Sequence, residues 1–304
     1  MPRPWRETLD EAILRAAAPA LEAGRAFSAR YAIRNHHLAV GARVAGWIAE
    51  RHGDAGLPTG RLRLEFAGTA GQSFGAFAVA GMHLALEGEA NDYLGKGLGG
   101  ATIAVRPFAG ARYAAAPGAD AHRQMILGNT ALYGATGGRL FAAGQAGDRF
   151  AVRNSGAVAV VEGAGNHCCE YMTGGIVAVL GRTGRNFGAG MSNGVAYVFD
   201  ETGAFASRVN HDLVLLGALE AEDDLVLRTL LAEHVAETGS ARARALLDDW
   251  AATRARFRKV EPRGAAVHVA AIRAAYLRDV ARPVVVAREV ALVVVPEMGA
   301  HTPG

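Results

Sequence analysis

The chain has 304 residues, of which 51% are hydrophobic and 20% charged, a composition typical of a globular protein with a sizeable core. The formal net charge of +3 comes from 32 basic and 29 acidic residues without a basic block, which argues against nucleic-acid binding. The 39 glycines exceed the usual share of about 7% and favour a thin, tightly turned β structure.

The N-terminal segment is predicted to be helical. Residues 5–23 carry apolar side chains at helical spacing and end at Gly24, and a second helix is predicted near 38–51. Acidic residues interrupt the apolar stretch that a signal peptide would need. We therefore assign residues 1–60 to an N-terminal helical cap and expect a cytoplasmic protein.

Glycine recurs at a fixed step in the middle of the chain, and each recurrence precedes a short apolar run. The glycines of this series are Gly81, Gly100, Gly138, Gly156, Gly175 and Gly194. Their common step is about 19 residues, with one double step, and a constant period of this size is typical of a solenoid. One period is too short for a strand, a helix and a crossover. Residues 61–205 are therefore predicted to form coils of strands and turns only.

The apolar runs can be aligned on their glycines. The fourth position after the glycine is always Ala or Val: Ala85, Ala104, Ala142, Val160, Val179 and Val198. The fifth is Leu, Val, Ala or Phe: Leu86, Val105, Ala143, Val161, Leu180 and Phe199. Stacked coils bury like residues on like. The columns predict a mainly β fold, a single-stranded parallel β-helix with helical segments at both ends.

A second glycine pattern, G-x-x-G-x-x-x-G and its variants, lies between the predicted strands. Its glycines are Gly68, Gly71, Gly75, Gly88, Gly95, Gly144, Gly147, Gly163, Gly181, Gly184 and Gly188. Asn91 and Asn166 replace the middle glycine in two copies. Because Gly and Asn tolerate positive φ, each copy is predicted to be a structural corner where the backbone turns left-handed.

Helical spacing returns after the repeats. Residues 220–257 predict two helices separated at Gly239, so residues 206–262 are assigned as C-terminal helices that cover the open end of the solenoid. Residues 263–304 are predicted to be a divergent, poorly ordered tail. Their apolar run at 284–295 is interrupted by charges and is shorter than the roughly 20 residues of a membrane helix.

Two short motifs imitate catalytic fingerprints. Ser73 lies in a G-x-S-x-G sequence, which in serine hydrolases needs a strand before it and a helix after it. Residues 95–100 match G-x-G-x-x-G, which binds dinucleotides when a helix follows. Alternating, strand-like residues follow both motifs. We therefore interpret them as corners and assign no catalytic or cofactor-binding residue.

Metal ligands are also considered and not assigned. The only cysteines, Cys168 and Cys169, cannot supply the four thiolates of an iron–sulfur cluster, and are predicted to be buried and reduced. His36 and His37 have no third ligand at a suitable spacing. His167, Cys168 and Glu170 alternate in direction, so a hydrogen-bonded corner is expected there rather than a metal site.

Polar residues concentrate around the central corners: Arg149, Arg153, Asn154, Glu162, Asn166, Glu170 and Arg185. Two interpretations remain open from the sequence. These side chains satisfy the backbone of the turns, or they form a docking face for another domain.

Several of these stretches together resemble the C-terminal (GXGXG) domain of the glutamate synthase large subunit. They are Ile33-Arg34-Asn35 with Val40-Gly41, and residues 68–77, 86–100, 132–138, 149–175 and 180–191. The resemblance covers roughly residues 5–262. It implies a right-handed parallel β-helix with an architectural role.

The resemblance also implies a division of labour. Glutamine hydrolysis, FMN chemistry and the iron–sulfur cluster would belong to other regions, and Pro2 stands where an amidotransferase would have its cysteine. The expected partners are the amidotransferase and FMN-binding regions, and the small subunit is a further candidate; no nucleic acid or membrane partner is expected. The leading hypothesis is a non-catalytic scaffold, as a fragment or split piece of the large subunit. The alternatives are a stand-alone subunit of a related redox complex, resembling one of formylmethanofuran dehydrogenase, and a serine hydrolase at Ser73.

Overall fold

The computed structural model describes residues 7–111, 121–281 and 293–294. Its strands are β1 (Phe27–Ile33), β2 (Leu62–Ala70), β3 (Met82–Ala90), β4 (Gly99–Arg106), β5 (Met125–Leu127), β6 (Gly137–Ala146), β7 (Ser155–Ala164), β8 (Thr173–Val179), β9 (Asn193–Phe199), β10 (Val214–Gly217), β11 (Phe257–Pro262) and β12 (Val293–Val294). Its α-helices are α1 (Leu9–Glu22), α2 (Ala42–His52), α4 (Ala221–Thr238), α5 (Ala241–Asp248), α6 (Trp250–Arg254) and α7 (Ala266–Val280).

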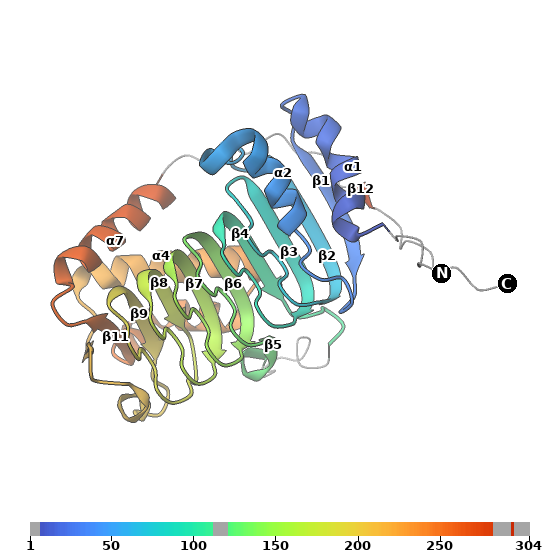
Figure 1. Cartoon of the computed structure of the whole chain (residues 1–304). Coiled ribbons are helices and arrows are strands. Elements are labelled where there is room, and N and C mark those ends of the chain that lie inside the picture. Colours follow the sequence, from blue (N-terminus) through green and yellow to red (C-terminus); the bar gives the residue numbers. More distant parts are fainter. Residues whose placement is uncertain (1–6, 112–120, 282–292, 295–304) are drawn as a thin grey trace, which may run out of the picture.

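The strands form one sheet that confirms the predicted β-solenoid. The order is β10-β11-β9-β8-β7-β6-β4-β3-β2-β1-β12, with β5 beside β3 and β6. Pairing from β1 to β9 is parallel, and Figure 1 shows these strands following one another along the molecule, with helices at both ends. Each coil contributes one main strand, as the glycine period predicts.

The N-terminal cap contains a strand that the sequence did not reveal. β1 lies between α1 and α2 and pairs in parallel with β2 from Phe27↔Leu62 to Ile33↔Gly68. The two helices are confirmed. α2 begins at Ala42 rather than near 38, because Gly41 has a φ of +98° and its N–H donates to the buried carboxylate of Asp10 (2.7 Å). The cap therefore contains the first coil of the solenoid.

The solenoid interior is a stack of aliphatic side chains. Register-matched residues in consecutive strands are Leu64, Leu84, Ile103, Leu140, Ala159, Val177 and Ala196. All of them are fully buried in one hydrophobic cluster. Burial of this kind contributes about 25 cal/mol per Å² of apolar surface and stabilises every coil through its neighbours.

The predicted columns were wrong by one residue in several coils. Ala104 pairs with Phe141 rather than Ala142, and Ala142 pairs with Val161 rather than Val160. A register shift between Gly99 and Thr102 causes the first displacement. Such bulges add one residue to a strand. Residues at equal distances after the glycine of each coil therefore do not always pair with one another.

Helices α4 and α7 cover the outer side of the strand layer. Outward side chains such as Phe141, Ile176 and Tyr197 form a second buried cluster with Leu230 of α4 and Val269 of α7. The inner side of the same strands shares the first cluster with residues of the loops, such as Phe150. The loops therefore lie across the core from α4 and α7.

The C-terminal end of the solenoid closes with a reversal of direction. β11 pairs antiparallel with β9, and β10 pairs antiparallel with β11. The predicted helices are present and separate at Gly239, whose φ is +71°, but the two strands were missed. The prediction of a poorly ordered tail is wrong for residues 266–280, which form α7, while 282–292 and 295–304 lie outside the described residues.

Val293 and Val294 of β12 pair with Ala29 and Arg30 of β1.

The division of the chain into four parts stays a prediction. Among the described residues, none of the helices combines the length and hydropathy of a membrane span.

Candidate functional site

The coils that follow β2, β3, β5, β6, β7 and β8 each turn at three alternate residues with left-handed backbone. In the coil after β3 they are Tyr93, Gly95 and Gly97, with φ of +62°, +63° and +62°. In the coil after β7 they are His167, Cys169 and Tyr171, with φ of +60°, +58° and +54°. The left-handed corners were predicted, but many hold bulky residues that rarely adopt this conformation.

The predicted corner glycines serve two different purposes. Five are left-handed: Gly68, Gly75, Gly88, Gly95 and Gly188. The other six lie outside the left-handed region, so their predicted reason was wrong: Gly71, Gly144, Gly147, Gly163, Gly181 and Gly184. They allow close approach instead; a Cβ on Gly181, for example, would lie 2.4 Å from the Glu162 carbonyl oxygen.

A ladder of Asp and Asn side chains connects the corners. Asp92 Oδ1 accepts the N–H of Asn129 (2.7 Å), and Asn129 Oδ1 accepts that of Asp148 (2.9 Å). Asp148 Oδ1 accepts the N–H of Asn166 (2.7 Å), and Asn166 Oδ1 accepts that of Arg185 (3.0 Å). We call this series the corner ladder. It satisfies one turn N–H per coil, as turns away from strands require.

After Asp92, which follows Asn91, each residue of the ladder is preceded by a glycine for a steric reason. A Cβ on Gly128, Gly147, Gly165 or Gly184 would lie 2.2–2.5 Å from the side-chain oxygen of the preceding rung. The sequence alignment of the corner patterns put Asn166 at the middle glycine, whereas in the structure Gly165 takes that place, so the predicted alignment was wrong by one residue. The Gly-Asx dipeptides Gly128-Asn129, Gly147-Asp148 and Gly165-Asn166 were the signal that could have located the ladder.

The polar residues near the corners divide into buried and exposed sets. Asn154 is fully buried; its Oδ1 accepts the N–H groups of Gly156 (3.2 Å) and Ala157 (2.9 Å), and its Nδ2 donates to the Ala157 oxygen (2.9 Å). Arg149 lies 3.7 Å from Glu170, and the guanidinium of Arg153 lies 5.9 Å from the ring centre of Tyr171. Asn154 therefore confirms the first interpretation, that these side chains satisfy turn backbone, while Arg149 and Arg153 face outward and the docking face stays a prediction.

Glu162 points to the other side, where it joins the strand layer to the helices. It is buried, lies 3.5 Å from His234 Nε2 of α4, and accepts a hydrogen bond from Ser240 at the start of α5. The N-cap hydroxyl of Ser240 also accepts the N–H of Ala243 (2.9 Å). This buried polar contact fixes α4 and α5 on β7.

A buried ionic cluster that the sequence did not reveal holds α7. Asp223 of α4 accepts hydrogen bonds from Tyr197 (2.7 Å) and Arg273, and Lys259 Nζ lies 3.4 Å from it. Burial alone would raise the pKa of Asp223, but the Glu220 N–H, the Tyr197 hydroxyl and Arg273 together lower it. The carboxylate therefore stays charged and links four elements of the C-terminal end.

The apparent catalytic motifs have the geometry of corners. Ser73 has a φ of +63°, donates its N–H to the Asp92 oxygen (2.9 Å), and is followed by turns and β3 rather than by a helix. Residues 95–100 lead directly into β4. Neither motif has the strand–helix context that its chemistry requires.

The sulfur and imidazole groups do not converge on a metal position. Cys168 and Cys169 are free and buried, with their sulfurs 3.8 Å apart, and burial raises the pKa of the Cys168 thiol. His167 points outward and bonds to Asn186 (2.9 Å), away from the buried Cys168 thiol. Two buried thiols do not fit an iron–sulfur cluster, which takes about four.

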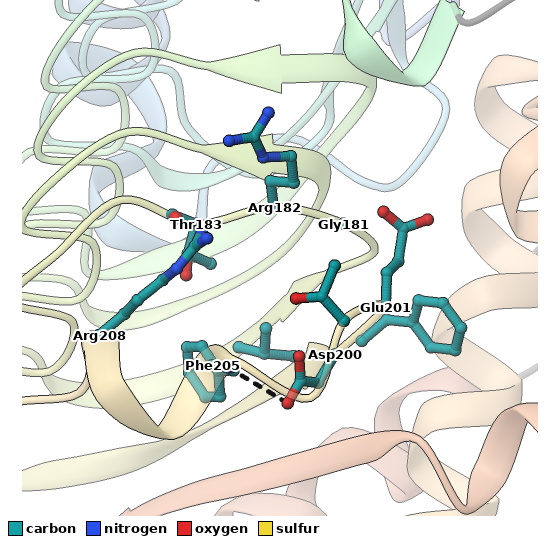
Figure 2. A pocket seen from close by; sticks show the side chains of 10 residues that line it. Gly181, Arg182, Thr183, Asp200, Glu201, Phe205 and Arg208 are labelled. Atoms are coloured by element: carbon teal, nitrogen blue, oxygen red, sulfur yellow. Dashed lines mark hydrogen bonds between the residues drawn. The ribbon is translucent and has the colours of Figure 1, made fainter.

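Two pockets lie near the last coils. The first has a volume of about 30 Å³ and is lined on one wall by Asp200 and Phe205. Figure 2 shows Arg208 reaching across to Thr183, and the Phe205 N–H donating to Asp200 (3.3 Å). This volume corresponds to roughly one water molecule, too little for FMN or glutamine.

The second pocket is larger, at about 250 Å³, and opens beside the corner ladder between Gln145 and Arg182. Small-molecule sites usually have about 300–1,000 Å³ and apolar walls. This pocket is lined mainly by glycine and polar side chains, including Asn166 and Thr183.

Glycine corners, a polar ladder between coils and helices at both ends define this chain as a repeat domain of the β-solenoid class. The family model for the GXGXG motif matches residues 10–263, and the chain belongs to this family. Over 233 residues it is 48% identical to a ferredoxin-dependent glutamate synthase of Pyropia yezoensis, covering 76% of this chain and 15% of that protein.

Other glutamate synthases give the same result. The NADPH glutamate synthase large chain of Bacillus subtilis is 45% identical over 253 residues, 83% of this chain and 16% of its own. The NADH glutamate synthase of Schizosaccharomyces pombe is 45% identical over 256 residues, 84% of this chain and 12% of its own. The chain thus spans only a small part of the length of these relatives.

Proposed function

We propose that this chain is a non-catalytic scaffold of a glutamate synthase, as a fragment or a split piece of the large chain. The observation that carries the proposal is the similarity over most of this chain to a small region of several glutamate synthases. A stand-alone role in a related redox complex is not favoured, because these relatives are all glutamate synthases.

The solenoid has the mechanical properties that a scaffold needs. The coils are joined to one another by strand pairing and by stacked apolar side chains, and those from Asp92 to Arg185 also by the corner ladder. Repeat architectures of this kind form extended, rigid surfaces. The scaffold would hold the amidotransferase and FMN-binding regions in a fixed relation, and the small subunit is a further candidate partner in enzymes that have one.

The cofactors of the reaction would lie outside this chain. FMN would supply the redox chemistry and an iron–sulfur cluster would carry electrons in the remaining regions of the synthase. The 30 Å³ pocket and the two buried thiols do not fit either group. We propose a structural role for the two thiols and for the residues that line the pocket. We expect the enzyme to act in the cytoplasm.

A chimera tests the proposal. The matching region of the Bacillus subtilis large chain is replaced by residues 7–281 of this chain, which keep α7 and its contact with Asp223, and glutamine-dependent NADPH oxidation is measured after assembly. We expect a flavin-containing enzyme with activity within about tenfold of the parent. A chimera that folds and binds flavin but has no activity, or an isolated chain that itself oxidises NADPH with glutamine, would contradict the scaffold role.

A further inference from the structure

One exposed side of the loop layer carries aromatic and basic residues in adjacent coils. We call it the aromatic–basic face and define it by Phe77, Tyr93, Lys96, Tyr133, Arg149, Arg153 and Tyr171. These residues occupy outward positions of consecutive corners, and the residues between them, such as Phe150 and Cys168, point into the core. The face therefore lies across the core from α4 and α7.

Backbone strain marks this face. Phe77, Arg153 and Tyr171 have φ of +58°, +56° and +54°, while the equivalent corners of other coils have Gly97, Gly134 and Gly190. Glycine would adopt this conformation without strain. Bulky residues at exposed left-handed positions do not improve the turn, and such strain is commonly retained for function.

The aromatic rings pack against the neighbouring coil. A Cβ on Gly97 would lie 2.6 Å from the Phe77 ring, and one on Gly190 would lie 2.5 Å from the Tyr171 ring. Both rings remain 55% exposed. They are fixed platforms that present one apolar surface outward, and rigid aromatic groups of this kind contribute strongly at protein interfaces.

The charges of the face are mainly positive. Lys96 Nζ lies 5.8 Å from the centre of the Tyr93 ring, and Arg153 lies above Tyr171. Two carboxylates border the face: Glu170, whose side chain is 13% exposed and lies 3.7 Å from Arg149, and the exposed Asp148, which accepts the Asn166 N–H in the corner ladder. The face thus combines aromatic rings with the three cationic side chains Lys96, Arg149 and Arg153, which matches the enrichment of Tyr, Phe and Arg in protein interfaces.

We propose that the aromatic–basic face docks an acidic surface of the synthase region that is not part of this chain. The proposal rests on the proposed function, since relatives continue for several times the length of this chain. A covalently joined partner would have a high effective concentration, so this modest patch would be sufficient. The cations are too few and too separated for a nucleic-acid groove, which follows a continuous phosphate backbone.

Glycine substitutions test the face without weakening the solenoid. Phe77→Gly and Tyr171→Gly relieve the left-handed strain, so the melting temperature of the isolated chain should stay within a few degrees of the parent or rise. The matched control is Leu225→Ala, which truncates a similarly exposed side chain (57%) on α4, across the core from the face.

In the active chimera, amide exchange of residues 71–77 and 166–173 should be at least tenfold slower than in the isolated chain. The double variant F77G/Y171G should lose that protection and show faster proteolytic release of the solenoid, while the Leu225→Ala variant should behave like the parent. An inactive parent chimera would contradict the proposed function. An active chimera whose protection survives the double substitution would overturn only the docking proposal, as would aromatic-dependent binding of single-stranded DNA.

Discussion

Asn154 is the side chain whose removal should cost the solenoid most per atom deleted. It is fully buried and makes three hydrogen bonds to the backbone at the start of β7, through the N–H groups of Gly156 and Ala157 and the carbonyl of Ala157. Asn154→Ala leaves these groups without their side-chain partner in a space that water does not reach.

The expected loss follows from the count of bonds. An unsatisfied buried backbone group costs about 1–3 kcal/mol, so three lost bonds should lower the free energy of unfolding by about 3 kcal/mol or more. At about 2 °C per kcal/mol for a chain of this size, the melting temperature should fall by about 6 °C. The amides of Gly156 and Ala157 should also exchange markedly faster with solvent.

The matched control is Asn129→Ala in the corner ladder. Asn129 makes an exposed bond to the N–H of Asp148 (2.9 Å), which water can replace, so its loss should cost at most about 1 kcal/mol. Calorimetry and amide exchange are measured on both variants. Equal destabilisation of the two would refute the claim that burial, rather than the number of turn bonds, determines the contribution of these asparagines.

Three further predictions concern other parts of the chain. Gly88→Ala should lower the free energy of unfolding in urea by more than about 3 kcal/mol, because φ is +145° and the new Cβ would lie 1.9 Å from the Gly68 carbonyl oxygen. The control Gly203→Ala, with a φ of +74° and open space around it, should lower it by about 1 kcal/mol. Equal losses in the two variants would contradict the steric argument. The pKa of Asp223 is lower in the folded chain than its ordinary value of 3.8, so the stabilisation that its carboxylate provides is present above that value and is lost as the pH falls below about 4. Between pH 3 and 7, the melting temperature of Asp223→Asn should therefore change less with pH than that of the parent. An equal change would contradict this role of Asp223. The Cys168 thiol, whose pKa is raised by burial, should not react with iodoacetamide at pH 8 until the chain unfolds, and mass spectrometry of the native protein would detect the opposite.

The architecture could be predicted from the sequence because a coil imposes a period on every level. Glycine spacing and apolar columns both follow from stacking, so the β-solenoid and its helical ends were visible without coordinates. The exact register was not, because bulges such as that between Gly99 and Thr102 shift the pairing by one residue while leaving the sequence period almost unchanged.

The corner details depended on contacts that sequence patterns do not encode. Left-handed backbone at Tyr93, Arg153 and Tyr171 contradicts residue preference and is imposed by the stacked coils. β1 and α7 were missed for a related reason: β1 is a strand between two helices, and α7 is held by the distant Asp223 through Arg273. Tertiary contacts outweighed local propensity in each case.

The reversal at β11 limits how this domain can change in length. Since β11 pairs antiparallel with β9 and its other edge is paired with β10, this end does not offer the register that another parallel coil would need. A lineage could therefore lengthen or shorten the domain only by inserting or deleting whole internal coils of about 19 residues, with the ladder rung and corner of each. Any partner that touches both ends would then be displaced in discrete steps of roughly 4.8 Å.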